Sequence, residues 1–189
     1  SIFDDIDCAS NRVNKYVLKS RNDYAEYIQN EISGNCIEGN SFYVSVDGDN
    51  NNPGTESDPL KTIGHALSLV RDDTTITTTI YVGEGVFSPS TTGEKFPIVL
   101  PDNVHLIGVS RETSILDAEA DLDKQSRVIK IVEECENIKV ANFTITGGNA
   151  ESAGCIGGGG ILVTHPDLEY VYDGPVSPVN AVFENLIVT

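Results

Sequence analysis

One acidic turn holds the residues whose types and spacing best suit a chemical role. Residues 47–58 read DGDNNNPGTESD, so Asp47, Asp49 and Asn51 place oxygen-bearing side chains at alternate positions and Asp58 is the twelfth residue. Carboxylate and amide oxygens are the ligands that Ca²⁺ prefers, and calcium loops of twelve residues use such spacing. The sequence therefore offers these four residues as possible calcium ligands.

The same turn has a structural interpretation, which turn chemistry favours. Position six is Asn52, where an EF-hand loop uses glycine, and a strand is expected before the loop where that motif needs a helix. Asp and Asn also hydrogen-bond their own backbone in turns, and Asp58 can cap the helix expected after it. Calcium is therefore the one cofactor that the sequence suggests, and a plain turn is its alternative.

Charge limits the classes of partner. The chain has 12 Lys and Arg against 29 Asp and Glu, a formal charge of -17. This charge repels phosphate backbones and anionic lipid, so nucleic-acid binding is not expected, whereas cations and neutral glycans fit. There is no apolar run of about 18 residues, so no membrane span is expected. The chain starts at Ser1 and has no Met, as a processed secreted product would, although a trimmed chain would look the same.

The cysteines suggest disulfides rather than a metal site. Their positions lack the spacing of zinc or thioredoxin-like motifs, and the three histidines lie far apart in the sequence. Because the number is even and the composition fits secretion, we favour the pairs Cys8 with Cys36 and Cys135 with Cys155, which close the short loops. Four reduced, buried thiols are the alternative.

The first forty residues are expected to form an appendage. Residues 15–19 (KYVLK) alternate like a short strand. Ser20 followed by Asp23 resembles a capping box, which predicts a helix through residue 32 that Gly34 ends. We therefore divide the chain into an N-terminal strand and helix appendage, residues 1–40, and a main body, residues 41–189.

An amphipathic helix is predicted near the start of the main body. Residues 42–46 (FYVSV) form an alternating strand, and after the acidic turn Asp58 and Pro59 suit a helix start. The apolar residues that follow recur at helical spacing along one face, namely Leu60, Ile63, Leu67 and Val70. Such a helix needs an apolar surface to cover.

The rest of the chain is a succession of short strands with an internal repeat. VHLIGVS at 104–110, IKVANFTIT at 138–146 and AVFENLIVT at 181–189 each interrupt an apolar alternation with one corner residue. The corners are Gly108, Asn142 and Asn185, spaced by 34 and 43 residues, which is in or near the range of solenoid repeats. Asn tolerates left-handed backbone geometry, so it can turn a corner and hydrogen-bond the same corner of the next coil.

Residues 42–70 resemble the opening of bacterial secreted right-handed parallel β-helix proteins of the pectate-lyase-like superfamily, including those with a DUF1565-type domain. The elements that carry the resemblance are YVS at 43–45, the acidic and Asn-rich turn at 47–51, NPGT at 52–55, and Pro59 with Thr62, Ile63 and Ala66. The resemblance covers about residues 42–189. It implies an all-β, right-handed parallel β-helix whose first coil is covered by the amphipathic helix.

The resemblance implies little about activity, because the superfamily includes lyases, hydrolases, epimerases, adhesins and surface proteins without catalysis. A lyase of this group would use acidic calcium ligands with an Arg or Lys base on one coil face. The charged residues nearest to such a set look like an ordinary solvated face, as do Arg111 and Asp117, so we name no catalytic residue. These nearest residues are Arg127, Lys130, Glu133, Glu134, Glu136 and Lys139.

We therefore expect an extracellular or cell-surface β-helix module with a structural, adhesive or glycan-binding role. Polysaccharide or other copies of the chain are its expected partners. Tyr170 with Tyr172 is the one aromatic pair offered for glycan contact, and packing within their loop is the favoured alternative. The chain stops at Thr189 inside an expected strand, so either a longer protein continues or the open last coil docks on a partner. The alternative is the N-terminal part of a calcium-dependent polysaccharide lyase or glycoside hydrolase.

Overall fold

The structure is a computed structural model with two compact units, Ser1–Gly39 and Asn40–Thr189, which we describe separately. The residues that it describes are 3–7, 12–19, 25–27, 32–33, 40–70, 76–132, 135–150, 159–164 and 180–189.

The first unit is a small antiparallel sheet built around one long strand. Strand β2 (Arg12–Lys19) pairs with β1 (Phe3–Asp7), β3 (Ala25–Tyr27) and β4 (Ile32–Ser33). The predicted helix through residue 32 is therefore wrong at β3 and β4, while its expected capping residues lie outside the described part. A lone helix of about 12 residues is marginal in water, whereas an open edge of β2 satisfies the backbone groups of both segments.

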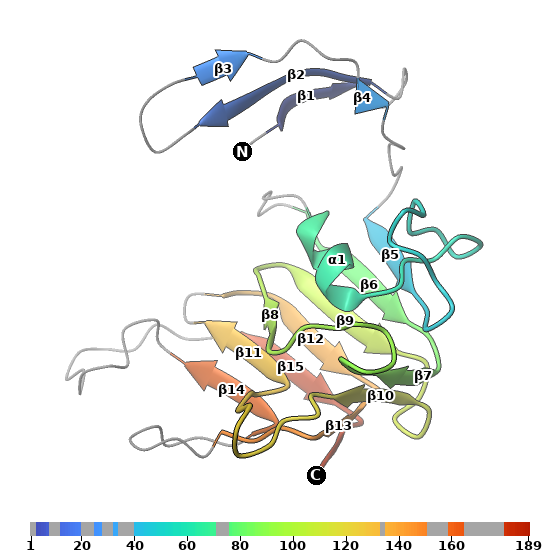
Figure 1. Cartoon of the computed structure of the whole chain (residues 1–189), viewed down its shortest axis with the longest axis vertical. Coiled ribbons are helices and arrows are strands. Elements are labelled where there is room, and N and C mark those ends of the chain that lie inside the picture. The colour runs from blue at the N-terminus through green and yellow to red at the C-terminus, as the bar shows by residue number, and fades with distance from the viewer. Residues whose placement is uncertain are drawn as a thin grey trace, which may run out of the picture. The chain divides into compact units, whose positions relative to one another are not determined.

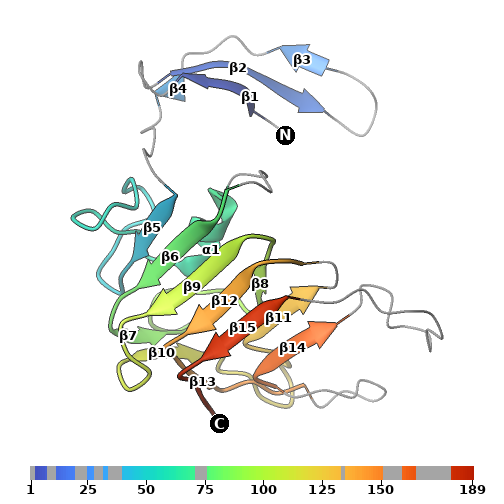
Figure 2. The same ribbon diagram turned by 180° about the vertical axis from the view of Figure 1, so that it is seen from behind.

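The second unit is a coil in which each complete pass of the chain adds one strand to each of three parallel sheets. The five-stranded sheet has the order β15-β12-β9-β6-β5, the three-stranded sheet β14-β11-β8 and the four-stranded sheet β16-β13-β10-β7. In Figure 2 the five-stranded sheet runs from blue β5 to red β15. This confirms the parallel β-helix that the strand repeat and the resemblance predict.

The strands of the coil are short, with two to five residues each. Their bounds are β5 (Ser41–Val44), β6 (Thr78–Val82), β7 (Gly85–Phe87), β8 (Ile98–Leu100), β9 (Val104–Gly108), β10 (Ser114–Asp117), β11 (Ile129–Val132), β12 (Ile138–Ala141), β13 (Thr144–Thr146), β14 (Ile161–Thr164), β15 (Ala181–Glu184) and β16 (Ile187–Val188).

The core is formed by stacked rows of apolar side chains, one row per inward position. In the five-stranded sheet Phe42, Ile80, Leu106 and Val140 occupy successive strands in register and are buried. The other two sheets contribute equivalent rows, since side chains at alternate strand positions face the same side. Burial of these β-branched and aliphatic side chains is the main force that holds successive coils together.

One corner of the coil is formed by the three residues of the internal repeat. Asn142 and Asn185 have φ of 65° and 51°, the left-handed region that Asn tolerates. Asn185 Nδ2 donates to Asn142 Oδ1 at 2.9 Å, and Asn142 Nδ2 donates to the Gly108 carbonyl at 3.1 Å. The corner side chains thus form a hydrogen-bonded ladder along the coil.

Helix α1 (Ile63–Ser68) covers the first coil, where it contacts β5, β6 and β8. Figure 1 shows it at the β5 end of the coil. Ile63 and Ala66 face the core and are buried, whereas the predicted face residues Leu67 and Val70 are partly exposed. Leu60 is also buried, but it lies before the helix, where its backbone forms a parallel bridge with Val44.

The helix begins later than the sequence predicts. Its N-cap is Thr62, whose hydroxyl accepts from the His65 amide at 3.2 Å, so the prediction that Asp58 caps it is wrong. The amides of Ile63 and Gly64 donate to the carboxylate of Glu94, at 2.6 and 3.0 Å. A carboxylate about thirty residues later in the chain therefore satisfies the first two amides of the helix.

Candidate functional site

The acidic turn is cross-linked by its own side chains. Asp49 Oδ1 accepts from the amide and from Nδ2 of Asn51, at 2.9 and 2.8 Å, and these hydrogen bonds hold the pKa of Asp49 below its usual value. Asn50 Oδ1 accepts from the amides of Lys61 and Thr62, at 3.0 and 3.1 Å. The turn thus joins strand β5 to the start of helix α1 by side-chain hydrogen bonds.

The turn does not bring its carboxylates together around one point. Within the described residues, no group of three or more His, Cys, Asp or Glu side chains is arranged to hold a metal ion, and this includes Asp47, Asp49 and Asp58. Asp58 Oδ2 instead accepts from the hydroxyl of Ser57 at 2.7 Å. The geometry favours the structural interpretation of the turn, and calcium binding stays a prediction to be tested.

A thermal shift assay tests the turn. We expect addition of millimolar Ca²⁺ to chelator-treated protein to leave the melting temperature unchanged, because a ligand raises it only by binding the folded state. The matched variant Asp49→Ala should give the same null response to calcium. A rise in the wild type that Asp49→Ala removes would establish a calcium site and contradict this expectation.

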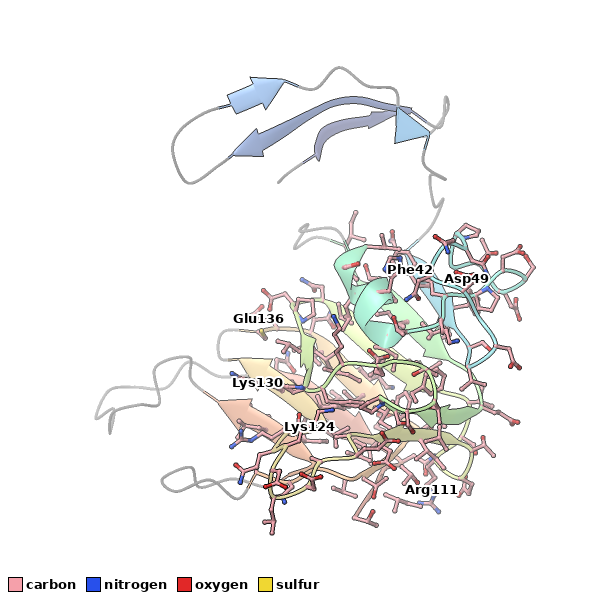
Figure 3. The ribbon with its side chains drawn as sticks, viewed as in Figure 1. Phe42, Asp49, Arg111, Lys124, Lys130 and Glu136 are labelled. Carbon is pink, nitrogen blue, oxygen red and sulfur yellow. The ribbon has the colours of Figure 1, made fainter. Side chains whose placement is uncertain are left out.

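The charged residues considered for catalysis lie on different parts of the coil. Lys130 is on β11 of the three-stranded sheet, and Lys139 is on β12 of the five-stranded sheet, where it pairs with Glu184 at 2.8 Å. Arg111 pairs with its neighbour Glu112 at 2.8 Å. In Figure 3, the labelled Arg111 lies apart from Lys130 and Glu136. Glu133 and Glu134 lie outside the described residues.

A second carboxylate, Glu119, joins two coils through hydroxyl groups. It accepts from the hydroxyl of buried Ser88 at 2.6 Å and from the hydroxyl and amide of Ser90, and these bonds lower its pKa. Asp117 Oδ1 accepts from the Glu119 amide at 2.9 Å. These residues connect the loops that follow β7 and β10, so their hydrogen bonds contribute to the structure of the coil.

The outer face of the five-stranded sheet carries a row of aromatic and apolar side chains that sequence reasoning missed. Tyr43, Tyr81 and Ile107 occupy the same register on β5, β6 and β9. The rings of Tyr43 and Tyr81 stack with centroids 5.1 Å apart and an interplanar angle of 26°. Tyr81 remains 40% exposed. The sequence indicates that each Tyr faces outward from its own strand. It does not show that the two rings stack, because that depends on the register between successive coils.

A hydrogen-bonding row lies beside this aromatic row. Ser41, Thr79, His105 and Lys139 occupy the next outward register position on β5, β6, β9 and β12. His105 Nε2 lies 3.3 Å from Asn137 Oδ1, which belongs to the turn before β12. We define the exposed sheet face as these two rows. It presents apolar and polar groups side by side on successive strands.

Several predicted residues cannot be placed. Cys135 is described, but Cys8, Cys36 and Cys155 lie outside the described residues, so neither disulfide is tested. Tyr170 and Tyr172 also lie outside the described residues. Among the described residues, no helix has the length and apolar character needed to cross a membrane.

Comparison with known proteins gives one family and one solved structure. No curated protein matches the chain. A matching solved structure is that of pectin methylesterase PemA from Erwinia chrysanthemi, with 18% identity and a TM-score of 0.40. The alignment covers 55% of this chain and 29% of that one. The family described as "Protein of unknown function (DUF1565)" matches residues 46–152, more than half of the sequence, and the chain therefore belongs to the DUF1565 family.

Proposed function

We propose that the chain is an extracellular or cell-surface β-helix module that binds neutral polysaccharide on the exposed sheet face. The observation that carries this proposal is the stacked, partly exposed pair Tyr43 and Tyr81, aligned with Ile107 on the neighbouring strand. Tyrosine combines an apolar ring with a polar hydroxyl, which suits it to surfaces that are partly wet.

The two rows match the amphipathic character of a sugar chain. Sugar rings present apolar C–H groups on their faces and hydroxyl groups around their edges. On the exposed sheet face, the Tyr43 and Tyr81 row can contact the C–H groups, while Thr79 and His105 can hydrogen-bond the hydroxyls. Neighbouring strands lie about 4.8 Å apart, so the same pair of contacts repeats at short intervals along the coil.

Charge selects neutral over acidic polysaccharide. The chain carries a formal charge of -17, which repels a polyanion at low ionic strength. On the exposed sheet face, the charge of Lys139 is compensated by its ion pair with Glu184. Binding to a neutral glycan should therefore be nearly independent of salt concentration, because no net charge is neutralised on binding.

Affinity electrophoresis and calorimetry test the proposal. We expect binding to at least one of a soluble β-glucan, mannan or xylan, and none to polygalacturonate. Tyr81→Ala should weaken the binding about tenfold, which corresponds to about 1.4 kcal/mol. The matched control is Leu122→Ala, since Leu122 is 72% exposed in the loop after β10 and should leave affinity unchanged. Equal affinity of Tyr81→Ala and wild type, or no binding to any neutral glycan, would refute the proposed site.

A further inference from the structure

The two rows of the exposed sheet face run along the coil axis. Figure 2 shows the strands of the five-stranded sheet side by side, so residues in the same register form lines that cross the strands. One line has the long side chains of Tyr43, Tyr81 and Ile107. The line beside it begins with the short side chains of Ser41 and Thr79. At β5 and β6 a raised apolar row therefore lies next to a lower polar row, and both follow the coil axis.

The apolar row begins at Tyr43. The chain that returns from the acidic turn occupies the outer edge of β5, where the Tyr43 amide donates to the Gly54 carbonyl at 2.8 Å. The Leu60 amide donates to the Tyr43 carbonyl, also at 2.8 Å. Both backbone polar groups of Tyr43 are thus bonded to the returning chain, which fixes this end of the row.

The ion pair of Lys139 with Glu184 lies at the other end of the row. Ala141 follows Ile107 in register on β12, and Glu184 is its partner on β15. Lys139 precedes Ala141 by two residues on the same face of the strand, and its Nζ lies 2.8 Å from Glu184 Oε2. The ion pair therefore runs beside Ala141, which is only 4% exposed although its position faces outward. The apolar side chains that a ligand can contact end at Ile107.

We propose that the exposed sheet face binds an extended neutral glycan, such as a β-1,4-linked chain, along the coil axis. One sugar lies on each of β5, β6 and β9, and the ion pair of Lys139 with Glu184 ends the site. This inference rests on the proposed glycan binding and adds the direction and length of the site. A sugar in such a chain advances by a length close to the strand spacing of about 4.8 Å, so about three sugars fit. A glycan lying along one strand would contact only one side chain of the apolar row.

Desolvation explains why the ion pair ends the site. The side chains of Lys139 and Glu184 are 32% and 55% exposed, so both charged groups are in contact with water. A neutral sugar that covered them would displace this water without supplying an opposite charge, and removing water from charged groups is costly. A fourth sugar therefore gains little from a position beyond β9.

Titration calorimetry on the full chain tests the length of the site. The ligands are cello-, manno- and xylo-oligosaccharides of increasing length, from the disaccharide to the hexasaccharide. In at least one series we expect the affinity to rise about tenfold from the disaccharide to the trisaccharide and then to stay nearly constant. Ile107→Ala should reduce the affinity for the trisaccharide to about that for the disaccharide, because the third sugar loses its contact on β9.

The outcomes separate this inference from the proposed function. An affinity that rises steadily up to the hexasaccharide would overturn the length of the site and leave glycan binding intact. A chain that binds a polysaccharide but none of the oligosaccharides would also overturn the inference alone. If neither the polysaccharides nor the oligosaccharides bind, the proposed function fails and the inference fails with it.

Removing the ion pair should lengthen the site. The double variant Lys139→Ala with Glu184→Ala uncovers Ala141 and leaves no unpaired charge. Its affinity for the tetrasaccharide should rise about threefold, the scale of one buried methyl group, while its affinity for the disaccharide stays the same. Exposed ion pairs contribute little to stability, and a loss of folding cannot produce a gain in affinity.

A second exposed ion pair provides the matched control. Arg111 and Glu112 also lie 2.8 Å apart, in the turn between β9 and β10, and the double variant Arg111→Ala with Glu112→Ala removes the same two charges. This control should bind every oligosaccharide like the wild type. An equal gain in the control, or an unchanged tetrasaccharide affinity when Lys139 and Glu184 are both replaced, would overturn the role of the ion pair.

Discussion

Replacing Gly108 with alanine is expected to lower the free energy of unfolding by about 3 kcal/mol, the upper part of the range for overpacked sites. A Cβ at this position would lie 2.3 Å from the Asn142 carbonyl oxygen and 2.8 Å from Ser114 Cβ. The first of these atoms belongs to the backbone of the next coil, which cannot move without disturbing the corner ladder. The substitution therefore forces neighbouring coils apart.

Thermal unfolding followed by circular dichroism measures the effect. For a domain of this size, about 3 kcal/mol corresponds to a fall in melting temperature of roughly 6 to 12 °C. The matched control is Gly93→Ala, because nothing lies within 4 Å of a Cβ there and the φ of 77° causes the only strain. Gly93→Ala should lower the free energy of unfolding by about 1 kcal/mol. Equal losses for the two variants would show that the close approach at Gly108 is not tight.

The parallel coil could be predicted from the sequence because its signals are local. Each strand carries its own apolar alternation, and each corner carries Gly or Asn at the point where the backbone must turn. The residue type of Asn142 and Asn185 alone indicates a left-handed corner, since few other residues adopt positive φ at low cost. Local sequence patterns of this kind predict the folded structure correctly when the repeat gives every coil the same environment.

The predictions from the sequence were wrong where contacts with residues far away in the sequence determine the local structure. The start of helix α1 depends on Glu94, which lies about thirty residues after that start, so the sequence alone favoured Asp58 as the cap. In the first unit, pairing with β2 prevails over the helical signals after Ser20. The Tyr43 and Tyr81 stack depends on the register between β5 and β6, which no spacing in the sequence reveals.

Removing the Glu94 carboxylate should destabilise the coil almost as strongly as the Gly108 substitution. Glu94 is only 3% exposed, and its two oxygens accept from the amides of Ile63, Gly64 and Lys95. Glu94→Ala leaves the first two amides of helix α1 without an acceptor, and each buried unsatisfied donor costs about 1 to 3 kcal/mol. We expect a loss of about 3 kcal/mol in denaturant unfolding, whereas the exposed control Glu112→Ala should change stability by less than about 0.5 kcal/mol.

The stability contributed by Glu94 should also depend on pH in a direction opposite to that of most carboxylates. Burial raises the pKa of Glu94 above its ordinary value of 4.5, and the amide hydrogen bonds oppose that rise without cancelling it. The folded chain therefore holds this proton more tightly than the unfolded chain does. The contribution is full below pH 4.5 and is lost as pH rises through the raised pKa.

The variant Glu94→Gln isolates this dependence, because glutamine keeps the size of the side chain and does not titrate. The difference in unfolding free energy between wild type and Glu94→Gln should be constant below pH 4.5 and should shift against the wild type as pH rises above it. Urea titrations from pH 4 to 8 measure that difference. A constant difference across this range would show that the three amides compensate the burial of the carboxylate fully. The folded and unfolded chains would then hold this proton equally, and the attachment of the helix to the first coil would be independent of pH.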